Sequence, residues 1–598
     1  MTKKVFILID YADFSVPSGC DCIAMTPGAM LAFEEKGFSY SSFDDLYRSS
    51  EFRPNNERLI HQTDELLTIL DKKYKPFIEF PRTFKGNVYW FLNFFVEIHY
   101  LNTICERIRK HYDKVYLAGS MEYNTSFEIN IDFSLQGIKF SNFHSSLKNK
   151  VAIIKTMLSP ECVWYPVRTT KQINKYRSMV LLKQIPKKIP EIFKKALPGF
   201  KKKWGKKGKK SIFIIQDGYE VSLLEEHMPE FTYVSPIEPL LDEIKISGTQ
   251  TRNIPKGLFA EEVKNFARKW FPLFEKQVFT LFNLYENKMF SYLPSFMKKL
   301  NEKFKKIKPQ ALFYSMFVNK IQEDVCAYLA NKNDIPVFYF QHAGTFAFCM
   351  EPYQRFMEQN DSVKKINIFQ SKAEKEIVAE NVSLEAEALG SIALYNLHRM
   401  HKDKRQKKKE VLYCAAMFNF SAYKNIGGNV EDKDFLQINK NIIDTANKFQ
   451  LKMDIKVHPG EERHNEIYFM KLSKFLGNKN IRIFKGFNAE KIIQDYGLLI
   501  LDYLGTSLLP SSMVFDIPVI IYLEDESLCI KETRRDLEKR FYIAKNKQEL
   551  ESYMDLYKKG KLESKFSMDM LDKYAFPVDK GNPGPVIADY IKGKINAF

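Results

Sequence analysis

The sequence predicts an α/β protein built from parallel β-sheets. Short runs of β-branched or aromatic residues alternate with long helical stretches through most of the 598 residues, which is typical of parallel sheets. The chain is too long for one hydrophobic core, so we expect two or more folded units. Hydrophobic residues make up 45% and charged residues 27%, a composition typical of globular rather than disordered chains.

The first half begins with a predicted strand at residues 5–9. A helix follows, with Thr26 as its N-cap, Pro27 at its first position and Gly37 just past its end. Residues 140–200 are basic and are expected to be irregular. We expect further helices at 57–72, 88–111, 259–305 and 317–332, and further strands at 114–117, 211–215, 311–314, 337–340 and 366–369.

The alternation restarts after a basic stretch at 402–409, which indicates a linker between two successive α/β sheets. Beyond it we expect strands at 410–414, 452–457, 481–484, 497–501 and 519–522, and helices at 433–449, 488–495, 547–558 and 583–594. The predicted division is an N-terminal domain (1–400) with helical and basic insertions (120–210 and 220–305), a linker (401–409), a C-terminal domain (410–580) and a C-terminal segment (581–598) whose helix packs back on the first domain.

Several classes of protein are disfavoured by composition. No apolar run reaches the ~18 residues that span a bilayer, and the best candidate, residues 89–100, carries Glu97. The apolar run near the N-terminus is too short for a signal peptide and is predicted to be a strand. Eight cysteines, with only Cys20 and Cys22 close together, indicate neither a disulfide framework nor a zinc ribbon, so we expect a reducing cytoplasm.

The formal net charge of +18 is clustered, and nine of the seventeen residues at 194–210 are lysine. One interpretation is a solvated loop. The other is attraction to a polyanion, and the aromatic Phe200 and Trp204 within the run favour an anionic membrane surface. No motif of a nucleic-acid-binding fold accompanies the charge, so we expect no specific nucleic acid partner.

Ligands of open α/β sheets bind beyond the carboxyl ends of the strands, so the polar residues there are the candidate site residues. Four predicted strand ends carry such residues: Asp217-Gly218, His342, His458-Pro459, and Asp502 followed by Gly505-Thr506-Ser507.

The segment Gly505-Thr506-Ser507 follows a buried-looking strand and opens a helix. Small hydroxyl residues and backbone N–H groups at a helix N-terminus suit a phosphate, although the same residues are also ordinary N-caps. The sequence has neither the P-loop pattern nor a Gly-x-Gly-x-x-Gly run after a strand, which argues against ATP hydrolysis and a dinucleotide.

His458 precedes a proline, which holds its backbone extended, and its imidazole could neutralise a leaving phosphate. The alternative is a histidine in a surface turn.

These segments together resemble a known family. KVHPGEE (456–462), FNAEKII (487–493) and LILDYLGTSLLPSSMVFDIPVIIY (499–522) resemble the nucleotide-binding domain of bacterial GT-B glycosyltransferases that use CMP-activated acidic sugars, the sialyltransferases and Kdo transferases. The resemblance implies two Rossmann-like domains facing across a cleft. It assigns the His-Pro motif to His458-Pro459, the ribose-binding glutamate to Glu490 and the phosphate-binding pair to Thr506-Ser507.

In the first half, Gln216-Asp217-Gly218 resembles the family's acidic-acidic-Gly motif, which supplies the general base. Gln216 departs from the pattern, where the family has a first acid. Glu220 and His342 are the next candidates for the general base. The candidates for substrate binding are Gly218, Glu220, His342 and Asp502. The resemblance covers about 150 residues (450–580 and 211–220).

The CDP-glycerol glycerophosphotransferases share part of this resemblance, because Asp502-Tyr503 followed by Thr506-Ser507 is similar to their Asp-Tyr-Ser-Ser run. A third possibility is a non-catalytic membrane-associated binding module.

The resemblance implies transfer of a sialic, nonulosonic or Kdo-type sugar from CMP to a cell-surface glycan or lipid-linked acceptor, as in bacterial capsule or lipopolysaccharide synthesis. Asp217 would be the general base or, if the donor's anomeric configuration is kept, the nucleophile. His458, Thr506 and Ser507 would stabilise the departing phosphate. No Asp-x-Asp lies at a predicted strand end and no His/Cys cluster has ligand spacing, so we expect no essential metal and no cofactor. The expected location is the inner face of the cell membrane.

Overall fold

The computed structural model describes most of the chain. The described residues are 2–126, 131–134, 137–140, 147–167, 210–215, 219–237, 257–315, 321–341, 347–348, 363–379, 385–400, 408–416, 431–457, 462–478, 480–484, 489–524 and 529–597. They form three parallel α/β sheets, which we call the N-terminal, central and C-terminal sheets, and one short antiparallel hairpin. The prediction of an α/β fold built from parallel sheets is confirmed.

The N-terminal sheet has five strands in the order β3-β2-β1-β4-β7. Its strands are β1 (Lys4–Leu8), β2 (Cys20–Ala24), β3 (Ser41–Ser42), β4 (Lys114–Gly119) and β7 (Cys162–Pro166), and its helices are α1 (Pro27–Glu35), α2 (Phe43–Leu46), α3 (Ser49–Tyr74), α4 (Val88–His111) and α5 (Leu147–Leu158). The hairpin consists of β5 (Ile131–Ser134) and β6 (Gly137–Phe140).

This separate sheet differs from the prediction, which treated residues 120–210 as an insertion in a single first domain. Residues 147–166 are not irregular, because α5 and β7 complete the N-terminal sheet. Neither β2 nor β7 was predicted. In β2 the charged Asp21 interrupts the apolar residues, and β7 is a partly exposed edge strand within a stretch that was expected to be irregular.

The central sheet has six strands in the order β13-β12-β11-β10-β8-β9. Its strands are β8 (Lys210–Ile214), β9 (Phe231–Val234), β10 (Ala311–Ser315), β11 (Val337–Phe340), β12 (Ile366–Phe369) and β13 (Glu385–Ala388). Its helices are α8 (Tyr219–Leu224), α12 (Ile321–Lys332), α14 (Lys372–Ala379) and α15 (Ile392–Met400).

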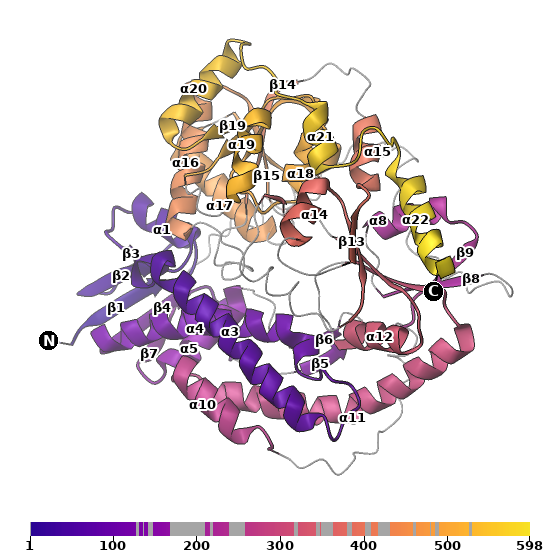
Figure 1. Ribbon diagram of the computed structural model, residues 1–598. Helices are drawn as coiled ribbons and strands as arrows, with labels where there is room; N and C mark the ends of the chain where they lie inside the picture. The colour runs from indigo at the N-terminus through magenta and orange to yellow at the C-terminus, as the bar shows by residue number, and fades with distance from the viewer. Residues whose placement is uncertain are drawn as a thin grey trace.

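The long helix predicted at 259–305 is two helices, α10 (Ala260–Trp270) and α11 (Glu275–Ile307). The break falls at Phe271, whose φ of −139° and ψ of 53° lie outside the helical region. The following Pro272 accounts for this, because proline disfavours helical backbone in the residue before it. Figure 1 shows both helices along the lower edge of the molecule, beneath the N-terminal and central sheets.

The C-terminal sheet has six strands in the order β16-β15-β14-β17-β18-β19. The strands are β14 (Lys408–Cys414), β15 (Met453–Lys456), β16 (Ile481–Phe484), β17 (Tyr496–Leu501), β18 (Val519–Tyr522) and β19 (Tyr542–Ala544). The helices are α16 (Asp432–Lys448), α17 (Glu462–Phe475), α18 (Leu508–Met513), α19 (Lys531–Arg540), α20 (Lys547–Lys558) and α21 (Met568–Tyr574). Numbered along the chain, this is the 3-2-1-4-5-6 order of doubly wound, nucleotide-binding sheets.

The chain passes from the central to the C-terminal sheet between residues 388 and 408. Lys408 and Lys409, assigned to the linker by the sequence analysis, belong to β14. The last helix, α22 (Pro583–Ala597), returns to the central sheet, where its Ile587 and Ile591 share a core cluster with strand residues such as Ile212. Figure 1 shows α22 beside α8 and β13, away from the rest of the C-terminal unit.

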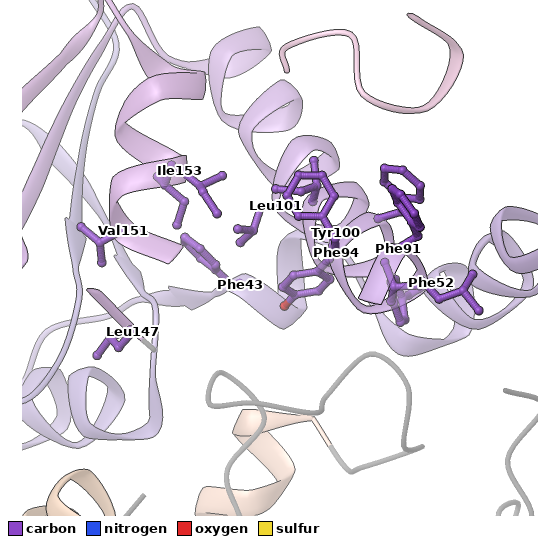
Figure 2. Packing of buried hydrophobic residues seen from close by; sticks show 14 of the residues in the cluster. Phe43, Phe52, Phe91, Phe94, Tyr100, Leu101, Leu147, Val151 and Ile153 are labelled. Carbon is purple, nitrogen blue, oxygen red and sulfur yellow. The ribbon is translucent and has the colours of Figure 1, made fainter. Parts of the chain in front are cut away.

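The largest core cluster explains the apolar run at 89–100. These residues belong to α4, which lies between its neighbouring helices and is buried along most of its length. Among the described residues, no helix is long and apolar enough to cross a membrane. Figure 2 shows part of the cluster, in which side chains of α4 (Phe91, Phe94, Tyr100, Leu101) lie near those of α2 (Phe43), α3 (Phe52) and α5 (Leu147, Val151, Ile153).

Candidate functional site

The C-terminal sheet changes direction between β14 and β17, which lie side by side at its centre. The crossovers leave these two strands toward opposite edges of the sheet, and such a switch point is where open α/β sheets bind ligands. Asp502 comes directly after β17, and Ala415 and Ala416 come directly after β14. The structure therefore puts Asp502 at the switch point.

Asp502 ties the two strand ends together. Its Oδ1 accepts a hydrogen bond from the backbone N–H of Ala416 at 2.8 Å, and its Oδ2 lies 2.5 Å from the Tyr413 hydroxyl oxygen. Asp502 is only 4% exposed, and this burial raises its pKa to about 6. Among the described residues, its carboxyl oxygens contact the backbone N–H of Ala416 and the hydroxyl of Tyr413.

The hydroxyl of Tyr413 lies between two acceptors, Asp502 Oδ2 and Asn439 Oδ1 at 2.8 Å. Asn439 cannot exchange its amide groups without loss, because its Nδ2 donates to the carbonyl of Phe435. Tyr413 has one proton for two acceptors, so both contacts are hydrogen bonds only when Asp502 is protonated and donates to Tyr413. Burial shifts the pKa of Asp502 in the direction of this protonated form.

Gly505 lies against the ring of Tyr503. A Cβ atom on residue 505 would lie 2.1 Å from the Tyr503 hydroxyl oxygen and 2.4 Å from Cζ. Any larger residue would require Tyr503 to move. The glycine is thus needed for the close approach of this ring to the loop that precedes α18.

Thr506 and Ser507 form the turn into α18. Thr506 Oγ1 accepts from the backbone N–H of Leu508 at 3.2 Å, and its carbonyl accepts from Leu509 at 3.0 Å. Ser507 is exposed, and its side chain makes no capping hydrogen bond to α18. Thr506 has the capping role that the sequence analysis offered as the alternative, whereas the Ser507 hydroxyl faces solvent.

Glu490 lies beside the same helix. It was expected on a helix at 488–495, but the structure has two 3-10 turns there, Ala489–Lys491 and Ile493–Asp495. The Ser511 hydroxyl donates to Glu490 Oε1 at 2.6 Å and also lies 3.0 Å from the carbonyl oxygen of Ser507. Ser511 thus connects Glu490 to the Thr506-Ser507 turn, and the structure brings these three predicted site residues together.

Arg540 holds the other end of α18. Its side chain is fully buried, and its Nη2 donates to the carbonyls of Ser512 (2.9 Å) and Phe515 (2.6 Å). Burial lowers the pKa of Arg540 to about 10. A guanidinium at a helix C-terminus complements the helix dipole, so Arg540 holds the C-terminal end of α18 in position.

Glu220 lies in the central unit, away from this cluster. Its Oε2 accepts from the backbone N–H of Ile392 at 2.9 Å, and its Oε1 accepts from Ala393 at 3.4 Å and from the Ser391 hydroxyl. Burial raises its pKa. Glu220 thus caps α15 from α8, and a role in substrate binding stays a prediction.

Five predicted site residues lie outside the described residues: Asp217, Gly218, His342, His458 and Pro459. The strands that precede them are described. β8 borders the direction change of the central sheet, between β8 and β10, and β15 is the neighbour of β14. Their assignment as site residues stays a prediction.

Sequence reasoning missed Tyr413, Asn439, Ser511 and Arg540. Ser511 had a signal, since it stands four residues after Ser507 and so on the same helical face. Tyr413 and Asn439 had none, because the contact of Tyr413 with Asp502 joins β14 to the end of β17, and that of Asn439 with Tyr413 depends on how α16 packs on β14. Among the described residues, no group of three or more His, Cys, Asp or Glu side chains is placed to hold a metal ion.

The sequence matches no protein-family model and no curated protein. Its shape is similar to solved structures, among them the UDP-GlcNAc 2-epimerase of Methanocaldococcus jannaschii in complex with UDP-GlcNAc and UDP. That match has 10% identity and a TM-score of 0.38, and it covers 64% of this chain and 99% of the epimerase.

Two further structures are MurG of Acinetobacter baumannii (9% identity, TM-score 0.36, 64% of this chain and 99% of MurG) and a glycosyltransferase of Rickettsia africae (8% identity, TM-score 0.33, 65% and 94%). Likeness at this level carries no conclusion about nucleotide, substrate or reaction.

Proposed function

We propose that the protein is a glycosyltransferase that moves a sialic, nonulosonic or Kdo-type sugar from a CMP donor to a cell-surface glycan or lipid-linked acceptor. The observation that carries the proposal is the switch point of the C-terminal sheet. There, a doubly wound strand order coincides with Asp502, Gly505 and the turn Thr506-Ser507, and Ser511 links that turn to Glu490. The nucleotide would lie at this edge, with its phosphate at Thr506-Ser507 and its ribose near Glu490.

Each part of the proposed site has a separate chemical task. The exposed Ser507 hydroxyl is free of helix capping and would donate to a phosphate oxygen, while Thr506 holds the turn. Asp502 is a positioning residue, because its carboxyl joins β17 to Ala416 rather than facing solvent. His458 would stabilise the departing phosphate, and Asp217, which follows a central strand, would take the proton from the acceptor hydroxyl. The reaction would need no metal.

A second candidate is transfer of glycerol phosphate from CDP-glycerol. The order Asp502-Tyr503 followed by Thr506-Ser507 favours it, and the ring of Tyr503 over Gly505 is compatible with either donor. A non-catalytic membrane-associated module is the third possibility. The basic segment 194–210 would hold any of the three at an anionic surface on the inner face of the cell membrane.

A thermal-shift screen tests the nucleotide assignment. CMP, CDP, UMP, UDP, GDP and ADP would be compared at equal concentrations. A ligand at 100 times its dissociation constant stabilises a protein by about 2.7 kcal/mol. The proposal expects stabilisation by cytidine nucleotides. Stronger stabilisation by UDP would indicate that the donor is a UDP-sugar. No stabilisation by any nucleotide would count against nucleotide-dependent transfer.

A further inference from the structure

The N-terminal sheet has a switch point of its own, which the proposed function leaves unassigned. Its order, β3-β2-β1-β4-β7, is the 3-2-1-4-5 pattern, and the direction changes between β1 and β4. The carboxyl ends of these two strands lead into Asp10 and Ser120. By the rule that applies to the C-terminal sheet, this edge is where a ligand of the N-terminal sheet would bind.

Strand register aligns three polar residues across this edge. Leu8 is level with Ala24 of β2 and with Ala118 of β4, so two residues later Asp10 is level with Thr26 and Ser120. The backbones of Thr26 (φ −136°, ψ 164°) and Ser120 (φ −66°, ψ 154°) are still extended. Side chains that are level on neighbouring parallel strands point to the same face. We call these residues the Thr26-Asp10-Ser120 row.

Thr26 and Asp10 are held by the protein. Thr26 Oγ1 donates to the carbonyl of Ile9 at 3.0 Å, lies 3.4 Å from Asp10 Oδ1 and accepts from the N–H of Ala29 at 3.2 Å. A Cβ atom on Gly28 would lie 2.3 Å from Asp10 Oδ1, so the carboxylate is pressed against the first turn of α1. These contacts hold the side chains of Thr26 and Asp10 in place. Ser120 is the third member of the row.

Ser120 is the group that points to a ligand. The residue is 8% exposed, and its Oγ is buried without a hydrogen bond. Leaving a buried hydroxyl unpaired costs about 1–3 kcal/mol, and buried polar groups are nearly always satisfied. A ligand that bonds to Ser120 would recover this energy.

The chemistry of the row limits the ligand class. The carboxylate of Asp10 repels anions, and one carboxylate with two hydroxyls is too few charged ligands for a strong divalent-cation site. A neutral group with several hydroxyls fits, because it can donate to Asp10 and share a hydrogen bond with Ser120. Two residues back along the strands, Tyr165 is level with Ala118, and its ring packs edge-on against Phe6 on the same face. Aromatic side chains commonly line small-molecule sites.

We propose that the switch point of the N-terminal sheet binds a neutral sugar unit through Asp10 and Ser120. This would make the N-terminal unit the carbohydrate-binding part of the protein. The identification of that sugar as part of the acceptor rests on the proposed function, whereas the site itself does not.

The test titrates the full chain with lactose, maltose and chitobiose, observed by saturation-transfer NMR, and separately with CMP. The variants are Ser120→Ala and Asp10→Asn. Ser473→Ala is the matched control, because Ser473 is also 8% exposed and its Oγ is also buried without a hydrogen bond, but it lies on α17. Ser120→Ala removes a buried hydroxyl that has no hydrogen bond, so its melting temperature is expected to equal or exceed that of the wild type.

The expected result is binding of at least one disaccharide, at least fivefold weaker in Ser120→Ala and Asp10→Asn and unchanged in Ser473→Ala, with CMP affinity unchanged throughout. The inference is overturned if the wild type binds none of the disaccharides, or if Ser120→Ala binds them equally well. Disaccharide binding that depends on Ser120 without any CMP binding would support this site while refuting the proposed function.

Discussion

The side chain of Asp44 in α2 caps helix α16, which begins 388 residues later: its Oδ2 accepts from the backbone N–H of Asp432 at 2.8 Å. A second contact runs in the opposite direction, from the C-terminal unit to a helix of the N-terminal unit. Glu431 Oε1 accepts from both the N–H and the hydroxyl of Ser49, at 2.7 Å each, at the start of α3. The N-terminal and C-terminal units thus cap one another's helices. The N-terminus of α16, the usual phosphate site of a doubly wound sheet, is occupied by a carboxylate of the same chain.

Replacing Asp44 with alanine should loosen the first turn of α16. A helix cap is worth about 1 kcal/mol, which corresponds to roughly fivefold faster local opening. Hydrogen exchange of the peptide spanning 431–437 should accelerate by about that factor. Lys433→Gln is the control, because it removes only the exposed Lys433–Asp45 ion pair beside the same turn. Equal acceleration in the two variants would show that the cap contributes nothing specific.

Asp502→Asn should alter the pH dependence of stability. The pKa of Asp502 is raised to about 6 in the folded protein from a usual value near 4, so the folded state binds more protons between these values. Stability supported by the protonated group is therefore lost as the pH rises from about 4 to about 6. Asparagine keeps the acceptor for Ala416 and supplies a permanent donor to Tyr413.

The melting temperature of Asp502→Asn relative to wild type should therefore rise as the pH increases through this window and level off above about 6. Comparing the two proteins at each pH cancels the contribution of other raised carboxyls, such as Asp71 and Asp434. A difference that is independent of pH would mean that Asp502 titrates normally.

Removing both hydroxyls in Thr506→Ala/Ser507→Ala should weaken CMP binding at least tenfold. Hydrogen bonds to a charged group are worth about 1.5–3 kcal/mol, and the double variant removes two candidate hydroxyl groups. Thr280→Ala, on the exposed side of α11, is the control for loss of a hydroxyl. An unchanged dissociation constant for CMP in the double variant would mean that the phosphate does not bind at this turn.

The class of fold and most of the strands could be predicted from the sequence. Continuous apolar runs marked the buried strands of the central and C-terminal sheets, since parallel strands covered on both faces read that way. The third sheet could not be predicted, because β2 and β7 are partly exposed and β3 has two residues. Without them, β1 and β4 had no sheet of their own and were assigned to the next domain.

The candidate site was predictable where local sequence places residues at a strand end, as for Asp502 and Thr506, and where a resemblance supplied a residue, as for Glu490. Its supporting contacts join distant segments. Asn439 reaches Tyr413 from α16, and Arg540 reaches α18 from α19. Such contacts depend on tertiary packing, which leaves no pattern in a single sequence.

The lysine-rich segment 194–210 should bring the protein to anionic membranes. Each charge near such a surface contributes about 1 kcal/mol, and salt screens it over about 8 Å at physiological ionic strength. Sedimentation with vesicles of 30% phosphatidylserine should fall steeply as salt is raised. A variant with these lysines changed to glutamine should stay in the supernatant, and equal sedimentation of the two proteins would make the segment a solvated loop.

Release of CMP from CMP-sialic acid and CMP-Kdo, compared between wild type and Asp217→Asn, is the direct test of the proposed sugar transfer. Asparagine keeps the size of the side chain and removes its basicity, and loss of a general base typically costs about 10²–10⁴ in rate. We expect acceptor-dependent CMP release by the wild type, at least a hundredfold lower kcat for Asp217→Asn, and CMP affinity within about twofold of wild type. Release of UMP or UDP from UDP-sugars with none from CMP-sugars, or normal turnover by the Asn variant, would contradict it.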